Sequence, residues 1–321
     1  MEKITGRCSN PNCQAHITGQ CYEHKDSLET CSNWTIKSNV PKTKKKKTDT
    51  ASAIAWTGEA IAPETINIIS QRSNPIIIAS VGNVDAGKTS YFAMLYLLLL
   101  NGHKLDDFQF AGSLTLIAWD RLADKLRYNK GSVAFPAPTP SNPDYYHLLH
   151  LALKKDSRLH DVILADASGE VFKLWADNKD DENVENARWI HKNASAFLLF
   201  VDCEALETRK AIARAEILDI ASRLVEDLGK RPVAVVWSKA DRINHVNSKL
   251  IELIKERLKD IFQDNYSEFE VTNYPNIDPE ELCHGNNLKT LNWLLNYVAQ
   301  PTEVIPEIEI TNEDDIFLNY K

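Results

Sequence analysis

The chain has 321 residues, of which 43% are hydrophobic and 26% are charged, and its formal net charge is −8. This length suffices for one large domain or two small ones, and the composition is typical of a soluble globular protein. The acidic balance argues against direct binding of nucleic acid, although a local basic patch could exist. The N-terminus is polar and the longest apolar run, residues 91–100, is too short to cross a bilayer. We therefore expect a cytoplasmic protein without a transmembrane segment.

Residues 1–35 are rich in cysteine and poor in aliphatic residues. They contain four of the six cysteines, Cys8, Cys13, Cys21 and Cys31. In a reducing compartment such clustering favours metal binding over disulfides, and four thiolates could hold Zn²⁺ and stabilise a small module that docks a partner. His16 and His24 are substitute ligands, and free cysteines in a flexible leader are the alternative.

The next segment, residues 36–70, is expected to be a linker. It includes Pro41 and a run of lysines between residues 42 and 47, which repel one another. We interpret this run as a solvated tether, and contact with nucleic acid or lipid is the alternative. The pattern changes after this segment, so we expect one domain over residues 71–300 and an acidic tail over residues 301–321.

Apolar runs of strand length alternate with helical patterns along the expected domain. The expected strands are residues 76–81, 147–153, 162–165, 196–201, 233–237 and 268–272. The expected helices are residues 88–101, 114–127, 205–228, 249–262 and 287–298. This alternation predicts an α/β fold in which helices cover both faces of a mostly parallel sheet.

The first expected strand and the first expected helix enclose a glycine-rich loop. Its residues are Gly82, Asn83, Val84, Asp85, Ala86, Gly87, Lys88, Thr89 and Ser90. The spacing is that of a phosphate-binding loop (P-loop), in which backbone N–H groups and the positive end of a helix face phosphate oxygens. Lys88 would reach the β- and γ-phosphates, and Thr89 would offer its hydroxyl to Mg²⁺. An accidental glycine turn is the alternative, which the flanking strand and helix oppose.

A second signal follows the strand expected at residues 162–165. The apolar run ends in Asp166, where a carboxylate that holds Mg²⁺ through water is expected after a P-loop. Gly169 stands three residues later and can offer its backbone N–H to a γ-phosphate. An Asp-x-x-Gly motif alone is weak evidence for a nucleotide site. Here it stands at the end of a strand and after a P-loop, which makes the evidence stronger.

The third signal, residues 238–241, indicates which base is bound. The sequence Ser-Lys-Ala-Asp follows a strand and resembles the Asn/Thr-Lys-x-Asp motif of GTPases. The Asp241 carboxylate can accept from the N1–H and the exocyclic amine of guanine, a donor pair that adenine lacks, and the stem of Lys239 can cover the base. Ser238 stands where the motif has Asn or Thr, so we expect fewer hydrogen bonds that stabilise the loop. The alternative is that residues 238–241 form a surface turn without a role in base recognition. Asn273, after the last strand, is the candidate to contact guanine O6 through its backbone N–H, although the usual small-residue motif is missing.

These motifs and their order over residues 74–300 resemble P-loop GTPases of the class that includes translation factors and signalling GTPases, the TRAFAC class. The loop from Gly82 to Thr89 is especially similar to that of translational elongation-factor GTPases. More loosely, the cysteine-rich start, the long segment before Asp166 and the Gly-Glu-Val-Phe sequence at 169–172 resemble the double-GTPase type of bacterial conflict and defence gene clusters. The resemblance implies the three-layer GTPase fold, binding of GTP and GDP with Mg²⁺, and a nucleotide-dependent switch that acts on a protein effector.

In such GTPases a threonine closes on Mg²⁺ and the γ-phosphate from a mobile loop. The proline-rich residues 130–144 suit such a loop, and Thr139 is the candidate. Thr115 and Ser141 compete with it, and a plain proline-rich loop is the remaining alternative.

Many GTPases also place Gln directly after Asp-x-x-Gly to orient the attacking water, and here that residue is Glu170. Its charge would lie near the phosphates, so we expect slow intrinsic hydrolysis that needs positive charge from an activating partner, a homo-oligomer or an internal arginine. Arg121, Arg127 and Arg158 are candidates for that arginine, and the sequence does not single one out.

Asp85 stands in the middle of the P-loop, beside the expected α- and β-phosphates. Several GTPase families similar in this loop place Asn or Asp there to hold a monovalent cation, K⁺ in particular, which offsets transition-state charge. The alternative is that Asp85 only caps the loop or points to solvent.

The resemblance therefore implies a GTP-hydrolysing switch. The alternative function is a zinc-dependent docking module whose GTP pocket is structural or nearly inactive. An ATPase is a poorer alternative, because residues 238–241 oppose it.

Overall fold

The computed structural model describes residues 6–8, 34–36, 57–71, 73–124, 128–129, 132–133, 139–140, 146–156, 158–273 and 284–299. The chain divides into two compact units, Met1–Ala55 and Trp56–Lys321. In the first unit, strands β1 (Gly6–Cys8) and β2 (Trp34–Ile36) pair antiparallel, with Cys8 opposite Trp34. The other cysteines expected to bind zinc lie outside the described residues: Cys13, Cys21 and Cys31.

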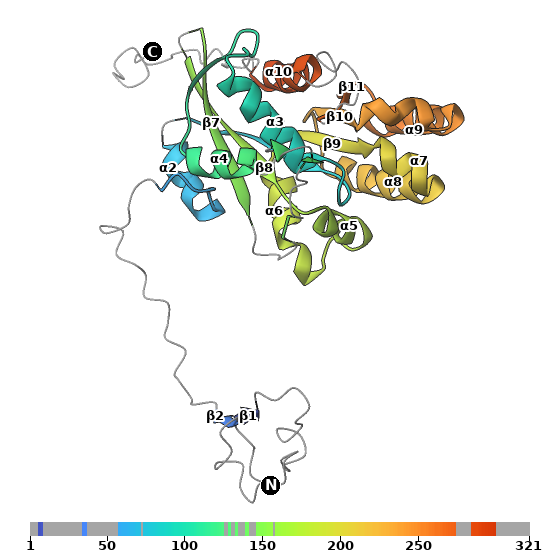
Figure 1. Cartoon of the computed structure of the whole chain (residues 1–321), viewed down its shortest axis with the longest axis horizontal. Helices are drawn as coiled ribbons and strands as arrows, with labels where there is room; N and C mark the ends of the chain where they lie inside the picture. The colour runs from blue at the N-terminus through green and yellow to red at the C-terminus, as the bar shows by residue number, and fades with distance from the viewer. Residues whose placement is uncertain are drawn as a thin grey trace, which may run out of the picture. The chain divides into compact units, whose positions relative to one another are not determined.

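The second unit is built on a seven-stranded sheet with the order β11-β10-β9-β3-β8-β7-β4 (Figure 1). Its strands are β3 (Ile76–Val81), β4 (Gln109–Gly112), β7 (His147–Lys155), β8 (Arg158–Asp166), β9 (Ala196–Asp202), β10 (Val233–Ser238) and β11 (Tyr266–Val271). Strands β8, β3, β9, β10 and β11 run parallel, whereas β7 is antiparallel to β8 and β4 is antiparallel to β7. The prediction of an α/β fold with a mostly parallel sheet is confirmed.

Helices cover both faces of this sheet, because the strand side chains alternate between two hydrophobic cores. In β3, Ile77 and Ala79 belong to one core, and Ile76 and Ile78 belong to the other. The helices of the first core are α2 (Ile66–Ser70), α5 (Gly169–Asp177), α6 (Glu185–Asn193), α7 (Cys203–Arg209), α8 (Ala211–Val225) and α9 (Ser248–Phe262). The helices of the second core are α3 (Lys88–Leu100), α4 (Leu116–Asp124) and α10 (Asn286–Val298).

Residues 205–228, expected as one helix, form parts of two helices. Asp202 begins α7 by accepting hydrogen bonds from the backbone N–H groups of Glu204 and Ala205, over 2.9 and 3.3 Å. α7 ends at Arg209 because Lys210 adopts φ 47° and ψ −113°, angles that an α-helix does not contain. The strand β4 and the helices α5 and α6 were not expected, and β4 is a short edge strand whose residues are mostly exposed.

Residues 57–70, which we expected within the linker, belong to the second unit and pack against its sheet. Ile61 forms a β-bridge with Leu148, and the carbonyl of Gly58 accepts from the N–H of Ala118 over 2.9 Å. Ile69 is buried in the first core. These contacts join residues 57–70 to the sheet.

A buried histidine joins the segment before β7 to the sheet. His150 of β7 accepts from the N–H of Leu114 at Nδ1 over 2.9 Å, so its other ring nitrogen has the hydrogen and donates to Asp161 Oδ1 over 2.9 Å. The backbone carbonyl of His150 also accepts from Trp119 Nε1 of α4 over 3.0 Å. These bonds fix residues 114–119 against β7.

Candidate functional site

The P-loop has the backbone that its glycines permit. Gly82 and Gly87 adopt positive φ angles of 148° and 84°, and Asp85 adopts 59°. A Cβ at Gly82 would lie 3.0 Å from the carbonyl oxygen of Phe200, which leaves little space for a side chain. The loop therefore turns sharply into the N-terminus of α3, where backbone N–H groups can bind an anion.

Lys88 places a cation inside this loop. Its ammonium donates to the carbonyl oxygens of Gly82 and Asn83 over 3.0 and 2.7 Å, and the side chain is buried. Burial lowers the pKa of Lys88 to about 8, against the attraction of Asp166 and Asp85, which raises it. A phosphate in the loop would supply the negative charge that favours the ammonium form.

Three oxygen-bearing side chains from distant parts of the sequence meet at the start of α3. Thr89 Oγ1 donates to Asp166 Oδ2 over 2.9 Å and lies 3.1 Å from Thr139 Oγ1. Asp166 ends β8 and is buried. Hydroxyl and carboxylate oxygens are the ligands that Mg²⁺ prefers, so the donor set at this position fits that ion.

The structure distinguishes between two of the three candidates for the switch hydroxyl, Thr139 and Thr115. Thr139 lies beside Thr89, whereas Thr115 is buried and accepts from the backbone N–H of His150 over 2.8 Å. Ser141 lies outside the described residues. Thr139 is thus the candidate that the described structure brings to the P-loop.

Gly169 lies directly against the P-loop. A Cβ on Gly169 would stand 2.2 Å from the carbonyl carbon of Asn83 and from the backbone nitrogen of Val84, a distance that no real Cβ tolerates. The next residue, Glu170, is exposed in the first turn of α5, and its N–H donates to the capping Ser168 over 3.3 Å. Only glycine lets the start of α5 pack on the loop so closely.

The residues expected to recognise the base lie at the ends of β10 and β11. Thr272 Oγ1 donates to Asp241 Oδ1 over 2.7 Å, and Thr272 is almost fully buried. Asn273 follows it, and its Oδ1 accepts from Asn287 of α10 over 3.4 Å. The contact between Thr272 and Asp241 was not predicted, although Thr272 stands directly before Asn273 in the sequence.

Lys239 is held by two carboxylates that the sequence analysis missed. Its ammonium bonds Asp202 Oδ2 and Glu204 Oε2, each over 2.9 Å. Burial acts to lower the pKa of Lys239, but Asp202 and Glu204 outweigh it, so the pKa is raised above its ordinary value. Ser238 Oγ donates to the carbonyl of Val201 over 3.3 Å, which ties the loop to β9.

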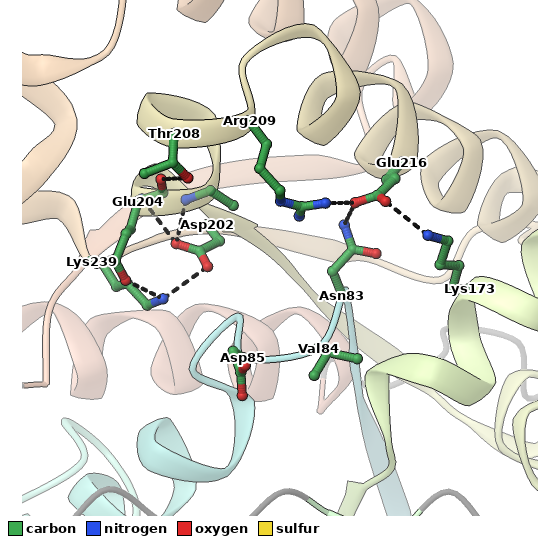
Figure 2. Close-up of a pocket in the computed structure, with 11 residues that line it drawn as sticks. Asn83, Val84, Asp85, Lys173, Asp202, Glu204, Thr208, Arg209, Glu216 and Lys239 are labelled. Carbon is green, nitrogen blue, oxygen red and sulfur yellow. Dashed lines mark hydrogen bonds and ion pairs between the residues drawn. The ribbon is translucent and has the colours of Figure 1, made fainter.

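A cavity of about 420 Å³ opens beside the P-loop (Figure 2). Its lining residues are Asn83, Val84, Asp85, Lys173, Asp202, Glu204, Ala205, Thr208, Arg209, Glu216 and Lys239. Glu216 of α8 accepts from Asn83 Nδ2, Arg209 Nη1 and Lys173 Nζ over 3.2, 2.7 and 2.9 Å. Burial acts to raise the pKa of Glu216, but the hydrogen bonds from Lys173 and Arg209 outweigh it and the pKa is lowered. One carboxylate thus joins the P-loop to α5 and α7.

The described residues contain no group of three or more His, Cys, Asp or Glu side chains arranged to hold a metal ion. Within the same residues, no helix has the length and apolar character needed to cross a membrane. The zinc prediction concerns Cys8, of which the structure describes the backbone in β1, and three cysteines outside the described part of the chain.

The chain was compared with known proteins. Among solved structures it is similar to the Arl6 (BBS3) small GTPase of Trypanosoma brucei with bound GppNp, with a TM-score of 0.39, 13% identity and coverage of 70% of this chain and 97% of that one. It is also similar to a protein described as nucleolar GTP-binding protein 1 of Plasmodium falciparum, with a TM-score of 0.42, 9% identity and coverage of 70% and 87%. A search of the curated proteins found no match.

The family model described as Double-GTPase 2 matches residues 76–294, which is more than half of the chain. The match begins at the first residue of β3 and ends inside α10, so it includes the P-loop, the Asp-x-x-Gly segment and the loop at 238–241. The chain, a P-loop protein of the GTPase type, belongs to the Double-GTPase 2 family.

Proposed function

We propose that the protein binds GTP together with Mg²⁺, hydrolyses it slowly and acts as a nucleotide-dependent switch. The convergence of Thr89, Thr139 and Asp166 within hydrogen-bonding distance supports this proposal most strongly. These residues come from three separate segments, and each has an oxygen of the kind that holds Mg²⁺ in GTPases, which supports the proposed ion site.

In the proposed complex, the backbone N–H groups of the P-loop and the ammonium of Lys88 hold the β- and γ-phosphates. Lys88 exchanges the loop carbonyls that it now contacts for phosphate oxygens, which are stronger acceptors. Thr89, Thr139 and Asp166 would hold Mg²⁺, which neutralises phosphate charge when it is bound. Asp241, oriented by Thr272, accepts from two N–H groups of guanine.

Hydrolysis in this site requires a water in line with the γ-phosphate. The Gly169 N–H, at the start of α5, would donate to a γ-phosphate oxygen and orient the group for attack. Glu170 can accept a hydrogen bond from the water, but its negative charge is repelled by the γ-phosphate. Intrinsic turnover is therefore slow.

The switch follows from the two segments that contact the P-loop. Thr139 and the start of α5 both lie against it, so loss of the γ-phosphate removes a shared partner from both. A protein effector that binds either segment would then respond to the nucleotide. We extend the proposal to bacterial conflict and defence because the cysteine-rich start and residues 169–172 resemble proteins of those gene clusters.

Two further ions belong to the proposal. K⁺ at Asp85 is supported by the position of this carboxylate in the P-loop, on the wall of the cavity. Zn²⁺ at the four cysteines is supported by the pairing of β1 with β2, because Cys8 then lies opposite Trp34, three residues beyond Cys31. Replacing Cys8 and Cys13 with Ser should release one zinc ion per chain in metal analysis. A zinc-free native protein would end the zinc proposal.

The experiment that tests the main proposal measures binding and hydrolysis of GTP and ATP by the purified full chain. We expect GTP to bind in preference to ATP and to be hydrolysed with Mg²⁺, and Lys88→Ala to abolish GTP binding. Lys249→Ala, at the start of α9, is the matched control and should bind as the parent does. Equal affinity for GTP in the parent and in Lys88→Ala would contradict the P-loop assignment, whereas GTP binding without turnover would favour the docking-module alternative.

A further inference from the structure

The proposed site is rich in negative charge. Asp85, Asp202, Glu204 and Glu216 all line the cavity beside the P-loop, and hydrolysis adds negative charge on the oxygen between the β- and γ-phosphates. A cation next to this oxygen would lower the barrier, and arginine is the side chain best suited to bind phosphate oxygens.

Of the three arginines suggested by the sequence, the two that the structure describes lie elsewhere. Arg121 pairs with Glu59 over 2.6 Å on α4. Arg158 is the first residue of β8 and Asp166 is the last, which separates them by roughly 26 Å along the strand. Arg127 lies outside the described residues.

Arg209, by contrast, lines the cavity together with Asn83, Val84 and Asp85 of the P-loop (Figure 2). Its Nη1 donates to Glu216 Oε2 over 2.7 Å, and the same oxygen accepts from Asn83 Nδ2 over 3.2 Å. Because the two nitrogens share one acceptor, they cannot be more than about 6 Å apart. The guanidinium group is therefore held next to the P-loop.

The backbone fixes this position. Arg209 is the last residue of α7, and the next residue, Lys210, has a positive φ of 47° that a lysine rarely adopts. Such local strain is frequent at functional sites. The side chain itself remains 42% exposed, and its one described hydrogen-bond acceptor is Glu216, so the other guanidinium N–H groups are available to a ligand.

The other cations of the cavity are less suited to this role. Lys239, within the base-recognition residues 238–241, is bound to Asp202 and Glu204. Lys173 is 53% exposed on α5, and an ammonium offers no planar fork of donors. Arginine can keep one N–H on Glu216 while another N–H donates to a phosphate oxygen.

We propose that Arg209 is an internal arginine finger and that Glu216 holds it beside the P-loop. This inference rests on the proposed GTPase function. In the reaction, the oxygen of water bonds to the γ-phosphorus, and the bond between that phosphorus and the bridging oxygen breaks. The electron pair stays on the oxygen of GDP, and the proton of the water leaves with the inorganic phosphate. The guanidinium of Arg209 donates to the bridging oxygen as its charge grows and is not consumed.

The test compares the parent with Arg209→Ala, Arg209→Lys and Arg257→Ala in the full chain. Single-turnover GTP hydrolysis, GTP affinity and thermal stability are measured for each. Arg257 forms a surface pair with Asp260 over 3.7 Å on α9, so its replacement is the control for loss of an exposed ion pair. We expect Arg209→Ala to lower the rate at least about 100-fold with GTP affinity within roughly threefold of the parent, and Arg257→Ala to change neither.

Arg209→Lys distinguishes a catalytic role of Arg209 from a structural role, because lysine can keep the ion pair with Glu216. A structural role predicts the parent rate for this variant, whereas an arginine finger predicts a rate at least about tenfold lower. If the parent hydrolyses GTP and either Arg209 variant matches its rate, or if the rate falls only in proportion to GTP affinity, Arg209 is not a finger. If the parent itself shows no turnover, the proposed function fails, and this inference fails with it.

Discussion

Thr272 donates a hydrogen bond from Oγ1 to Oδ1 of Asp241 over 2.7 Å, and this bond joins the end of β11 to the loop after β10. The carboxylate that we expect to recognise guanine is thereby oriented by a buried hydroxyl group. The bond leaves Oδ2 of Asp241 and the remaining lone pair of Oδ1 to accept from the base.

Thr272→Val should weaken GTP binding while leaving the fold intact, because valine has the shape of threonine without its hydroxyl. The loss of a buried hydrogen bond to a carboxylate predicts an affinity about tenfold lower, or ~1.4 kcal/mol. Titration calorimetry with GTP measures this change. Thr65→Val, which removes an exposed hydroxyl that donates to Ala62, should bind GTP as the parent does. An unchanged affinity in Thr272→Val would show that Asp241 needs no orientation by Thr272.

Asp202→Asn should lower GTP affinity roughly fivefold, because Lys239 loses its charged partner in the less exposed of its two ion pairs. Asparagine remains a good cap for α7, so thermal stability should change little. Glu204→Gln is the internal comparison, and its effect should be smaller because Glu204 is 43% exposed. The order of the two affinities, measured with a fluorescent GTP analogue, decides whether Asp202 or Glu204 positions Lys239.

Gly169→Ala should reduce GTP hydrolysis roughly 100-fold, because its Cβ would overlap the P-loop backbone and move the start of α5 away from the γ-phosphate. GDP binding should change much less, since GDP has no γ-phosphate. Gly229→Ala also adds a methyl group, at a glycine with φ 61° and open space around it, and should leave hydrolysis unchanged. Parent-like turnover in Gly169→Ala would mean that the contact seen here is absent from the reacting complex.

GTP turnover should be faster in K⁺ than in Na⁺ at fixed ionic strength, and Asp85→Ala should remove the difference. A carboxylate beside phosphate is repelled unless a cation lies between them. Asp227→Ala is the matched control, because Asp227 has nearly the same φ, 58°, in a turn outside the cavity lining. Equal rates in K⁺ and Na⁺ for the parent, alone and with an activating partner, would show that Asp85 is not a cation ligand.

The sequence predicted the central strands well because they are buried on both faces and read as continuous apolar runs. The meeting of Thr89 and Asp166 was predictable for a related reason, since the carboxyl ends of parallel strands lie at one edge of the sheet. β4 could not be predicted, because a short exposed edge strand has no such run.

The cavity beside the P-loop could not be predicted from the sequence either. Glu216 contacts Asn83 across 133 residues of sequence, and only the packing of α8 against α5 and α7 brings them together. Arg209 and Lys173 have the sequence appearance of ordinary charged residues on helix surfaces. Such sites depend on long-range packing, which local periodicity does not contain.

The hydrogen bonds around His150 set limits on how far Thr139 can move. On one side, residues 114–119 are fixed to β7 and α4 continues to Asp124, and on the other side β7 itself begins at His147. Thr139 therefore belongs to a stretch of chain whose two ends are held by α4 and by β7. The length of this stretch sets how far Thr139 can extend toward the P-loop. An insertion or deletion within the stretch would change that distance without displacing the P-loop.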